Sequence, residues 1–169
     1  MRFALTNQKA KLRSFSSSPE LHGDNPQPAG YLAFSVNLPA DQLDQFSPTF
    51  KDHVFTKNGN GGADLANQTH PAPNLRYPIK AYKWDDEMVG GTIVIPHGLG
   101  GKSDLKLPII KLSRFELAPM EGGTCVIDFM VSCHPSEKEF AKLPFLQAKE
   151  VELTIIPPEA DKDLADAAP

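Results

Sequence analysis

The stretch TCVIDFMVSCH, residues 124–134, places an apolar side chain at every second position. Successive side chains of a strand point to opposite faces of a sheet, so these positions share one face. They are Cys125, Ile127, Phe129, Val131 and Cys133. The pattern predicts a strand with this face toward a core, in which both cysteines are small buried residues.

Further strands are predicted on either side of this stretch. Residues 31–38 and 150–155 alternate in the same way, and residues 1–6 and 89–96 are short apolar runs. Between residues 105 and 117 the apolar face switches twice, which indicates bulges that bend a sheet toward a barrel or a coiled sandwich. Together with two short helices, these segments predict a mainly β fold, an antiparallel barrel or sandwich of six or seven strands.

The remaining segments predict turns and short helices. Residues 7–28 are polar, rich in serine and proline, and predict a loop or an edge element followed by a turn. Asn37 suits the cap and Pro39 the first turn of a helix of about two turns. Ser136 and Glu139 have the spacing of a capping box at the start of the other helix.

The length of 169 residues suits one domain with its own core. We expect this single β-rich domain to cover residues 1–158. Residues 56–74 are rich in glycine, asparagine and proline and predict a long mobile loop. The acidic, alanine-rich residues 159–169 predict a disordered tail.

The net charge of −4 is unevenly distributed. Residues 157–169 hold four acids and one lysine, so they contribute −3 and the rest of the chain −1. The first 19 residues hold Arg2, Lys9, Lys11 and Arg13 and no acid. Proteins that bind a phosphate backbone usually have a clearly basic surface, and this distribution permits such a face without demonstrating it.

The two cysteines and the absence of a long apolar run predict the compartment. Buried thiols without a secretory signal suit a reducing environment, and no run approaches the roughly 20 apolar residues that span a bilayer. We therefore expect a soluble protein without membrane contact, in the cytoplasm of a cell.

The candidate binding surface lies in LRYPIKAYKW, residues 75–84. As one strand, this segment has an apolar face and an opposite face with basic and aromatic side chains. Such a face is typical of platforms that stack unpaired bases and hold phosphates with nearby cations. The predicted nucleic-acid-binding residues, including one lysine of the glycine-rich segment after residue 96, are Arg76, Lys80, Tyr82, Lys83, Trp84 and Lys102.

No pattern in the chain predicts catalysis, a cofactor or a metal. Cys133 and the adjacent His134 lie on opposite faces of one strand, so they do not form a nucleophile–base pair. His22 and Asp24 have no second pair of ligands at a useful spacing. The glycine-rich residues 97–103 lack the first glycine of a phosphate loop and precede a strand instead of a helix. We expect a protein that is not an enzyme.

Six short motifs, mostly turns and strand ends, occur in this order: His22-Gly23-Asp24, Pro28-Ala29, Leu75-Arg76-Tyr77-Pro78, Gly122-Gly123-Thr124, His134-Pro135 and Leu153-Thr154 to Pro157-Pro158. The order resembles a family of phage and prophage proteins over most of the chain. Members of that family are largely uncharacterised and tend to be encoded near phage recombination and replication functions. The resemblance implies a phage-encoded protein that acts inside a bacterial cell, and it brings no catalytic residues.

Two functions of different classes agree with these observations. The first is a phage accessory protein that binds single-stranded DNA in recombination or replication, with the basic N-terminal segment extending the surface. The alternative is an inhibitor or adaptor that binds a host protein, such as a defence protein or a nuclease, through an acidic patch or an exposed sheet edge. Edge strands also make a homo-oligomer possible. A virion component ranks third, because nothing in the chain resembles a repetitive assembly element.

Overall fold

The computed structural model describes residues 1–22, 24–56, 74–99 and 101–160. The predicted mobile loop at 56–74 lies outside these residues except for its two ends, and the predicted tail at 159–169 except for its first two residues. The described strands are β1 (Leu5–His22), β2 (Asn25–Pro39), β3 (Phe55–Thr56), β4 (Asn74–Leu75), β5 (Tyr82–Trp84), β6 (Met88–Val89), β7 (Thr92–Ile95), β8 (Leu105–Met120), β9 (Thr124–Cys133) and β10 (Glu150–Ile156). The described helices, all short, are η1 (Ala40–Gln45), α1 (Phe50–Val54), η2 (Gly101–Ser103), α2 (Glu137–Phe140) and η3 (Leu143–Leu146).

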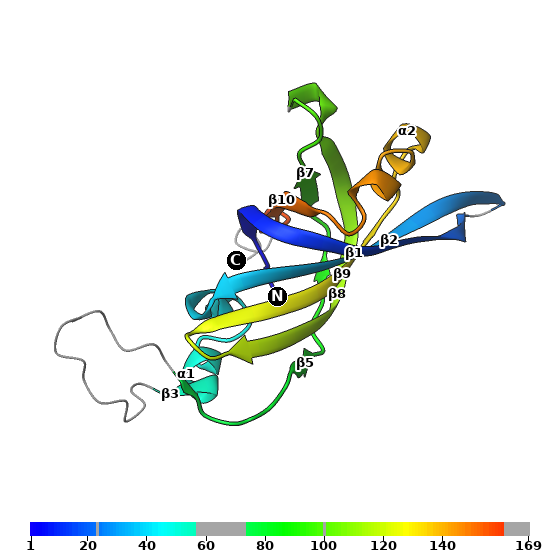
Figure 1. Ribbon diagram of the computed structural model, residues 1–169. Coiled ribbons are helices and arrows are strands. Elements are labelled where there is room, and N and C mark those ends of the chain that lie inside the picture. Colours follow the sequence, from blue (N-terminus) through cyan, green and yellow to red (C-terminus); the bar gives the residue numbers. More distant parts are fainter. Residues whose placement is uncertain (23, 57–73, 100, 161–169) are drawn as a thin grey trace, which may run out of the picture.

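Six of these strands form a closed antiparallel barrel (Figure 1). The order around the barrel is β8-β7-β10-β1-β2-β9, and β9 closes it by pairing with β8. The prediction of a mainly β fold, an antiparallel barrel or sandwich, is confirmed, and the barrel is the form present. The described residues form five short helices where two were predicted.

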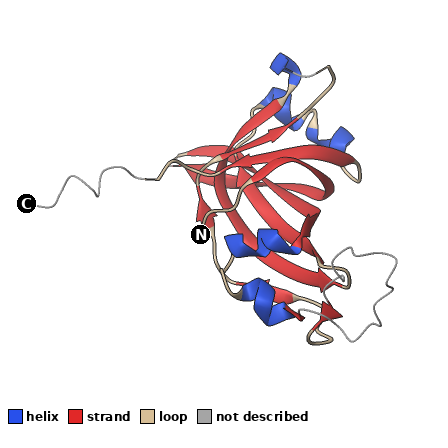
Figure 2. Cartoon of the chain, turned by 90° about the vertical axis from the view of Figure 1, so that its left-hand side faces the viewer, coloured by secondary structure: helices blue, strands red, loops and turns tan. Residues whose placement is uncertain are grey.

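The connections make the second half of the barrel a Greek key. Strands β7, β8 and β9 follow one another along the sheet, and β10 returns through α2 and η3 to lie beside β7. The β1–β2 hairpin fills the space between β10 and β9. The short helices lie at the two ends of the barrel: η2, α2 and η3 at one end, and η1 and α1 at the other (Figure 2).

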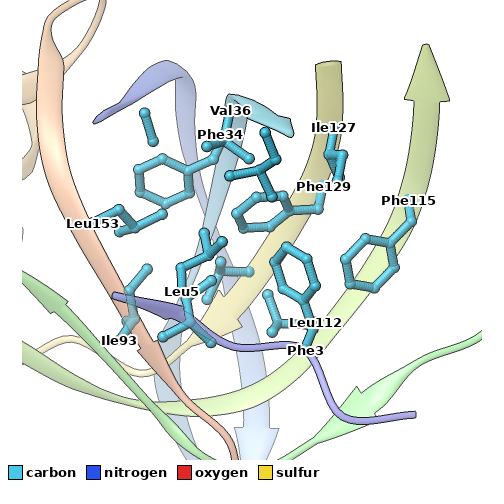
Figure 3. Packing of buried hydrophobic residues seen from close by; sticks show 14 of the residues in the cluster. Phe3, Leu5, Phe34, Val36, Ile93, Leu112, Phe115, Ile127, Phe129 and Leu153 are labelled. Atoms are coloured by element: carbon cyan, nitrogen blue, oxygen red, sulfur yellow. The ribbon is translucent and has the colours of Figure 1, made fainter. Parts of the chain in front are cut away.

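The barrel interior is apolar and contains a cluster of phenylalanines (Figure 3). Phe3 precedes β1 and is fully buried, with its ring centroid 5.3 Å from that of Phe115 and 5.4 Å from that of Phe129. Phe34 of β2 stacks on Phe129 at 5.8 Å. Each such ring removed from water contributes roughly 1.5–3 kcal/mol. Both cysteines lie in this core, as predicted.

Two bulges in β8 account for the predicted switches of its apolar face. The register with β9 shifts between Ile109 and Lys111 and again between Ser113 and Glu116. Arg114, inside the second shift, has a φ of 55°, in the left-handed region that a residue with a side chain rarely adopts. This shift turns the strand.

The prediction of a loop or edge element up to Pro19, followed by turn-forming residues up to Pro28, is wrong for most of this length. Strand β1 continues to His22 and pairs with β2 along its course, because the ladder bonds of a hairpin come from the backbone and tolerate polar side chains. Beyond the barrel the two strands project as a ribbon (Figure 1). We call this ribbon, residues 18–22 of β1 with residues 25–29 of β2, the arm.

The arm has prolines at positions where another residue would present a backbone N–H donor at the edge of the ribbon. His22 pairs with Asn25 across a two-residue connection, and the pair that flanks such a connection is hydrogen-bonded. Pairs alternate along a ladder, so the next proline-bearing pairs, Leu21–Pro26 and Pro19–Pro28, point their backbone nitrogens outward. The prolines therefore remove outward donors without costing a bond between the two strands.

Two predictions about residues 75–96 are wrong. The predicted strand at 75–84 is divided into β4 and β5, with no strand at residues 76–81. The predicted hairpin ending at Pro96 is absent, because β5, β6 and β7 run in one direction along the same edge of β8. The hairpin of this region is instead β7–β8, with the glycine-rich residues 97–103 at its tip, as predicted for that segment.

The helix predictions hold in part. The capping box is confirmed: the Ser136 backbone N–H donates to Glu139 Oε2 at 2.7 Å. The predicted helix after residue 39 is a 3-10 helix whose cap position is Pro39, and Asn37 still belongs to β2.

Candidate functional site

The predicted nucleic-acid-binding residues do not form one surface. Lys102 belongs to η2, at the end of the barrel opposite to β5 (Figure 1). Arg76 and Lys80 lie in the non-strand segment before β5, and the Arg76 guanidinium donates to the backbone oxygen of Asp52 at 3.2 Å. Sequence reasoning grouped these cations on a continuous strand, which the fold does not contain.

The aromatic side chains of β5 pack onto the core. Tyr82 and Trp84 share one face of the strand, as predicted, but the Tyr82 ring lies edge-on to Phe50 with 5.2 Å between centroids. Trp84 contacts the same phenylalanine at 5.3 Å and Phe46 at 5.7 Å. The face predicted to stack bases is therefore the one that covers the core, and both rings are only half-exposed.

A groove of about 850 Å³ lies elsewhere, on the outer face of the barrel. Strand register builds its floor, because five neighbouring strands each contribute one residue to a row of cross-strand partners. The row consists of Ser16 of β1, Tyr31 of β2, Ser132 of β9, Lys111 of β8 and Val89 of β6. Two of these five are serines, and Ser113 of β8 also lines the groove. Small side chains on an outward face leave a hollow between the larger residues at its ends.

Apolar side chains are exposed in this groove. Val89 of β6 is 70% exposed and Ile110 of β8 is 39% exposed. Met130, Tyr31 and Trp84 also line the hollow. Isolated exposed apolar residues are ordinary on protein surfaces, whereas their collection in a hollow is typical of a binding surface.

Acidic residues stand at both ends of the groove. Asp85, Asp86 and Glu87 form the connection between β5 and β6, and Glu20 comes from the arm. The groove cations are Lys111 and Arg114, so its lining carries two more negative than positive charges. The Lys111 Nζ lies 2.9 Å from Glu87 Oε1, and the amino terminus lies 3.7 Å from Asp86 Oδ2.

Arg114 and Trp84 also line a second hollow of about 600 Å³ beside the groove. Lys83 and Glu116 belong to that hollow as well. Because Arg114 lies in a bulge, its side chain leaves the alternation of β8, and it lines both hollows. Within the described residues its guanidinium forms no hydrogen bond or ion pair.

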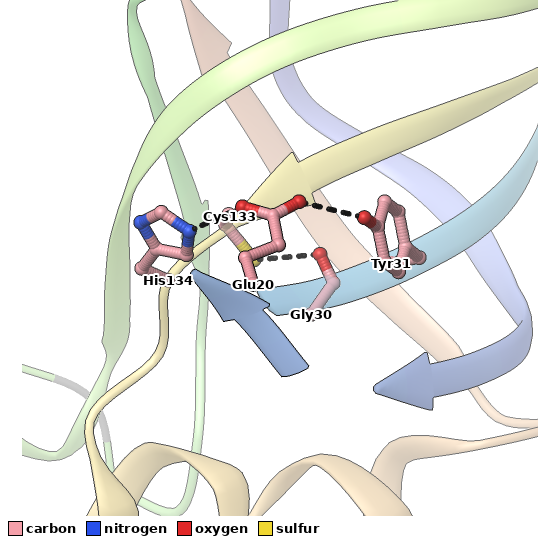
Figure 4. A network of polar contacts seen from close by, with 5 residues as sticks. All are labelled: Glu20, Gly30, Tyr31, Cys133 and His134. Atoms are coloured by element: carbon pink, nitrogen blue, oxygen red, sulfur yellow. Dashed lines mark hydrogen bonds and ion pairs between the residues drawn. The ribbon is translucent and has the colours of Figure 1, made fainter. Parts of the chain in front are cut away.

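A polar network holds the root of the arm at one end of the groove (Figure 4). Tyr31 donates its hydroxyl to Glu20 Oε1 at 2.8 Å, and His134 Nε2 lies 3.0 Å from Glu20 Oε2. On the next residue pair, the Cys133 thiol lies 3.7 Å from the backbone oxygen of Gly30. These contacts join β1, β2 and β9 and fix where the Glu20 carboxylate stands.

The two cysteine thiols are both buried and lie away from the groove. Burial raises the pKa of Cys125 to about 12. Burial, with a smaller effect from the Glu139 carboxylate, raises the pKa of Cys133 to about 12 as well. Such thiols are poor nucleophiles at neutral pH. Within the part of the chain that the structure describes, no group of three or more side chains is arranged to hold a metal ion.

Sequence reasoning missed the groove because its residues come from six strands that lie side by side only through register. One signal was present: the double change of face in β8 marks the bulge that brings Ser113 and Arg114 to the outer surface. The pairing of β1 with β2 and of β6 with β8 has no comparable sequence signal.

Comparison with protein-family models, with curated proteins and with solved structures finds no match to the chain. The resemblance to phage proteins therefore stays a prediction. Among the described helices, none combines the length and the apolar character needed to cross a bilayer.

Proposed function

We propose that the protein is a non-enzymatic binding module that holds a segment of another protein in the groove on its outer face. The observation that carries this proposal is the exposure of Val89 and Ile110 inside the hollow. Covering apolar side chains with a partner removes their surface from water, which is the main driving force of protein association. The resemblance to phage proteins supports a partner in the bacterial host, such as a nuclease or a defence protein.

The partner contacts the face of the sheet and not its edge. The groove floor consists of side chains on consecutive strands, whose backbones already pair with each other. The arm, which has unpaired edges, has prolines at positions that face outward. Strand addition is therefore disfavoured at the arm, and side-chain contacts in the groove carry the interaction.

Photo-crosslinking tests the proposal at a single side chain. A photoreactive phenylalanine analogue at position 89 should form one discrete protein adduct when the full chain is irradiated in bacterial cells. The same analogue at position 145 is the matched control, because Val89 and Phe145 are both 70% exposed and Phe145 lies outside the groove.

Adding Ile110→Asp should remove the adduct at position 89, since it places a charge in the apolar part of the groove. Equal adducts at positions 89 and 145, or none at either, would contradict the proposal.

Binding of single-stranded DNA is the second candidate, and the second hollow favours it. There Trp84 stands beside two cations, Lys83 and Arg114, against two acids, Asp85 and Glu116. Base stacking on an aromatic side chain contributes roughly 1–3 kcal/mol, so Trp84→Ala should weaken binding of a fluorescent oligothymidine about tenfold or more. Affinity measured at two salt concentrations, with duplex of equal length and Phe145→Ala as controls, decides this candidate.

A further inference from the structure

The charge and shape of the groove specify what kind of segment it holds. We infer that the occupant is an extended segment of about six residues in which basic and apolar side chains alternate. This inference rests on the proposed function and adds the chemistry of the partner.

The length of the segment follows from the floor of the groove. Its row of cross-strand partners begins at Ser16 and ends at Val89, four strand spacings apart. With strands about 4.8 Å apart, the row is about 19 Å long. An extended chain advances about 3.3 Å per residue, so about six residues cover the row.

The alternation follows from the difference between floor and rim. In an extended segment, every second side chain points toward the floor, where Val89, Ile110 and Met130 offer apolar contact. The intervening side chains point toward the rim, where the carboxylates stand. Apolar residues on one face of the segment and cations on the other therefore match both parts of the groove.

Each end of the groove places an aromatic ring beside a carboxylate. At one end the Tyr31 hydroxyl is bonded to Glu20, and at the other Trp84 is followed directly by Asp85. A lysine or arginine gains from both groups, through the face of the ring and through the carboxylate. The Asp85 side chain forms no ion pair or hydrogen bond with any described residue, which leaves its charge for a partner.

An anionic occupant is disfavoured. Of the two groove cations, Lys111 is already paired with Glu87, and four carboxylates surround the hollow. A phosphate backbone or an acidic peptide would meet a net repulsion here. Nucleic acid is therefore an outcome that the experiment must distinguish.

The experiment compares two fluorescent hexapeptides that differ only in charge, acetyl-KVKVKV-amide and acetyl-EVEVEV-amide, with the purified full chain. Fluorescence anisotropy at low and moderate salt should show the lysine peptide binding at least tenfold more tightly than the glutamate peptide. The preference should shrink as salt rises, because screening weakens the contribution of charge.

Two pairs of variants locate the binding. Asp85→Lys should weaken the lysine peptide at least fivefold, whereas Asp44→Lys, an exposed acid of η1 outside the groove, should leave it unchanged. Val89→Ser should weaken the binding of both peptides, whereas Phe145→Ser should weaken the binding of neither. All four positions are on the surface, so these variants keep the core intact.

The outcomes separate this inference from the proposed function. Equal affinity for the two peptides, or no effect of Asp85→Lys, overturns the basic occupant, while a position-89 crosslink would keep the groove as a protein-binding site. If neither the position-89 crosslink nor peptide binding is observed, both the proposed function and this inference are overturned. Oligothymidine that binds more tightly than the lysine peptide would assign the surface to nucleic acid and overturn the inference.

Discussion

Within the barrel, β1 and β2 bury alternate side chains, whereas in the arm the same two strands bury almost none. Leu12, Phe34 and Val36 have at most 2% of their surface exposed. Of the arm side chains that the structure describes, only Ala29 is buried. The two strands pair with each other in both regions, and only in the barrel does each pair with a further strand, β10 or β9. The regions therefore differ in side-chain burial and in the number of strand partners.

This difference teaches that strand pairing does not reveal how a region is stabilised. In the barrel, burial of apolar surface holds the strands, and the ladder bonds add a smaller net term. In the arm, the ladder and the polar contacts of Glu20 at its root hold a ribbon without a core. Mutations should therefore change global stability in the first region and local order or association in the second.

The largest effect is expected for Phe34→Ala in the barrel part of β2. Removing a buried phenylalanine leaves a cavity beside Phe129 and should lower the free energy of unfolding by roughly 3–5 kcal/mol. Gln27→Ala in the arm part of the same strand is the control and should change it by less than about 0.5 kcal/mol. Urea unfolding followed by circular dichroism measures both, and similar losses for the two variants would show that the arm is part of the cooperative core.

A smaller effect is expected where the arm meets the barrel. A Cβ at Gly30 would lie 3.1 Å from two ring carbons of Pro135, closer than packed groups normally approach. Gly30→Ala should therefore destabilise the protein by roughly 1–3 kcal/mol. Thermal unfolding measures the loss, and the double variant with Pro135→Ala should recover part of it. No recovery would place the cause elsewhere than in this contact.

The two buried thiols of β9, one at this junction and one at the other end of the strand, make stability depend on pH. Burial raises the pKa of Cys133 and of Cys125 from the ordinary 9.0 to about 12, so the folded state keeps both thiols protonated where the unfolded chain ionises them. The stability they contribute is complete below pH 9 and is lost between pH 9 and 12. The free energy of unfolding should fall by about 1 kcal/mol per thiol from pH 9 to pH 10.

Urea unfolding at pH 8, 9 and 10 measures this dependence, and Cys133→Ala should halve the part that comes from the thiols. Because Cys133 lies at the root of the arm and Cys125 at the far end of β9, iodoacetamide should reach Cys133 first if the arm opens locally. Equal protection of the two thiols would show that the root of the arm is as stable as the barrel.

At the edge of the arm we expect the smallest change in stability, together with a change in the association of the protein with itself. Pro26→Val with Pro28→Val supplies outward amide donors, so the arm should begin to pair with a second copy while stability changes by less than about 1 kcal/mol. Gln27→Val is the matched control, because the amide of residue 27 points toward β1. Sedimentation velocity should show dimers for the double variant alone, and dimers for the control would assign the effect to hydrophobicity.

The sequence predicts the strands whose two faces differ, because burial of one face leaves a pattern of period two. Phe129 and its neighbours in β9, and Phe34 and its neighbours in β2, are of this kind. The continuation of β1 to His22 has no such pattern, and among the arm side chains that the structure describes only Ala29 is buried. Propensity therefore favoured a loop where tertiary pairing forms a strand.

The candidate site was less predictable, because it depends on contacts between distant residues. Trp84 carries the pattern of an exposed aromatic face, but Phe46 and Phe50, more than 30 positions earlier, pack against it. The groove floor depends on which residue of β6 meets which residue of β8, and a shift by one position would remove Val89 from it. Register of this kind is absent from a single sequence.

The pairing of β1 with β10 joins the first strand of the barrel to the last, and the barrel is incomplete without it. Leu5 pairs with Ile155 and Lys11 with Glu150, so this contact spans nearly the whole described chain. At roughly 5–20 residues per second, β10 leaves the ribosome on the order of 10 s after β1. Contacts between residues so distant in the chain also form slowly during folding. Barrel closure is therefore a late event of synthesis, and the translation of the C-terminal strand sets its earliest time.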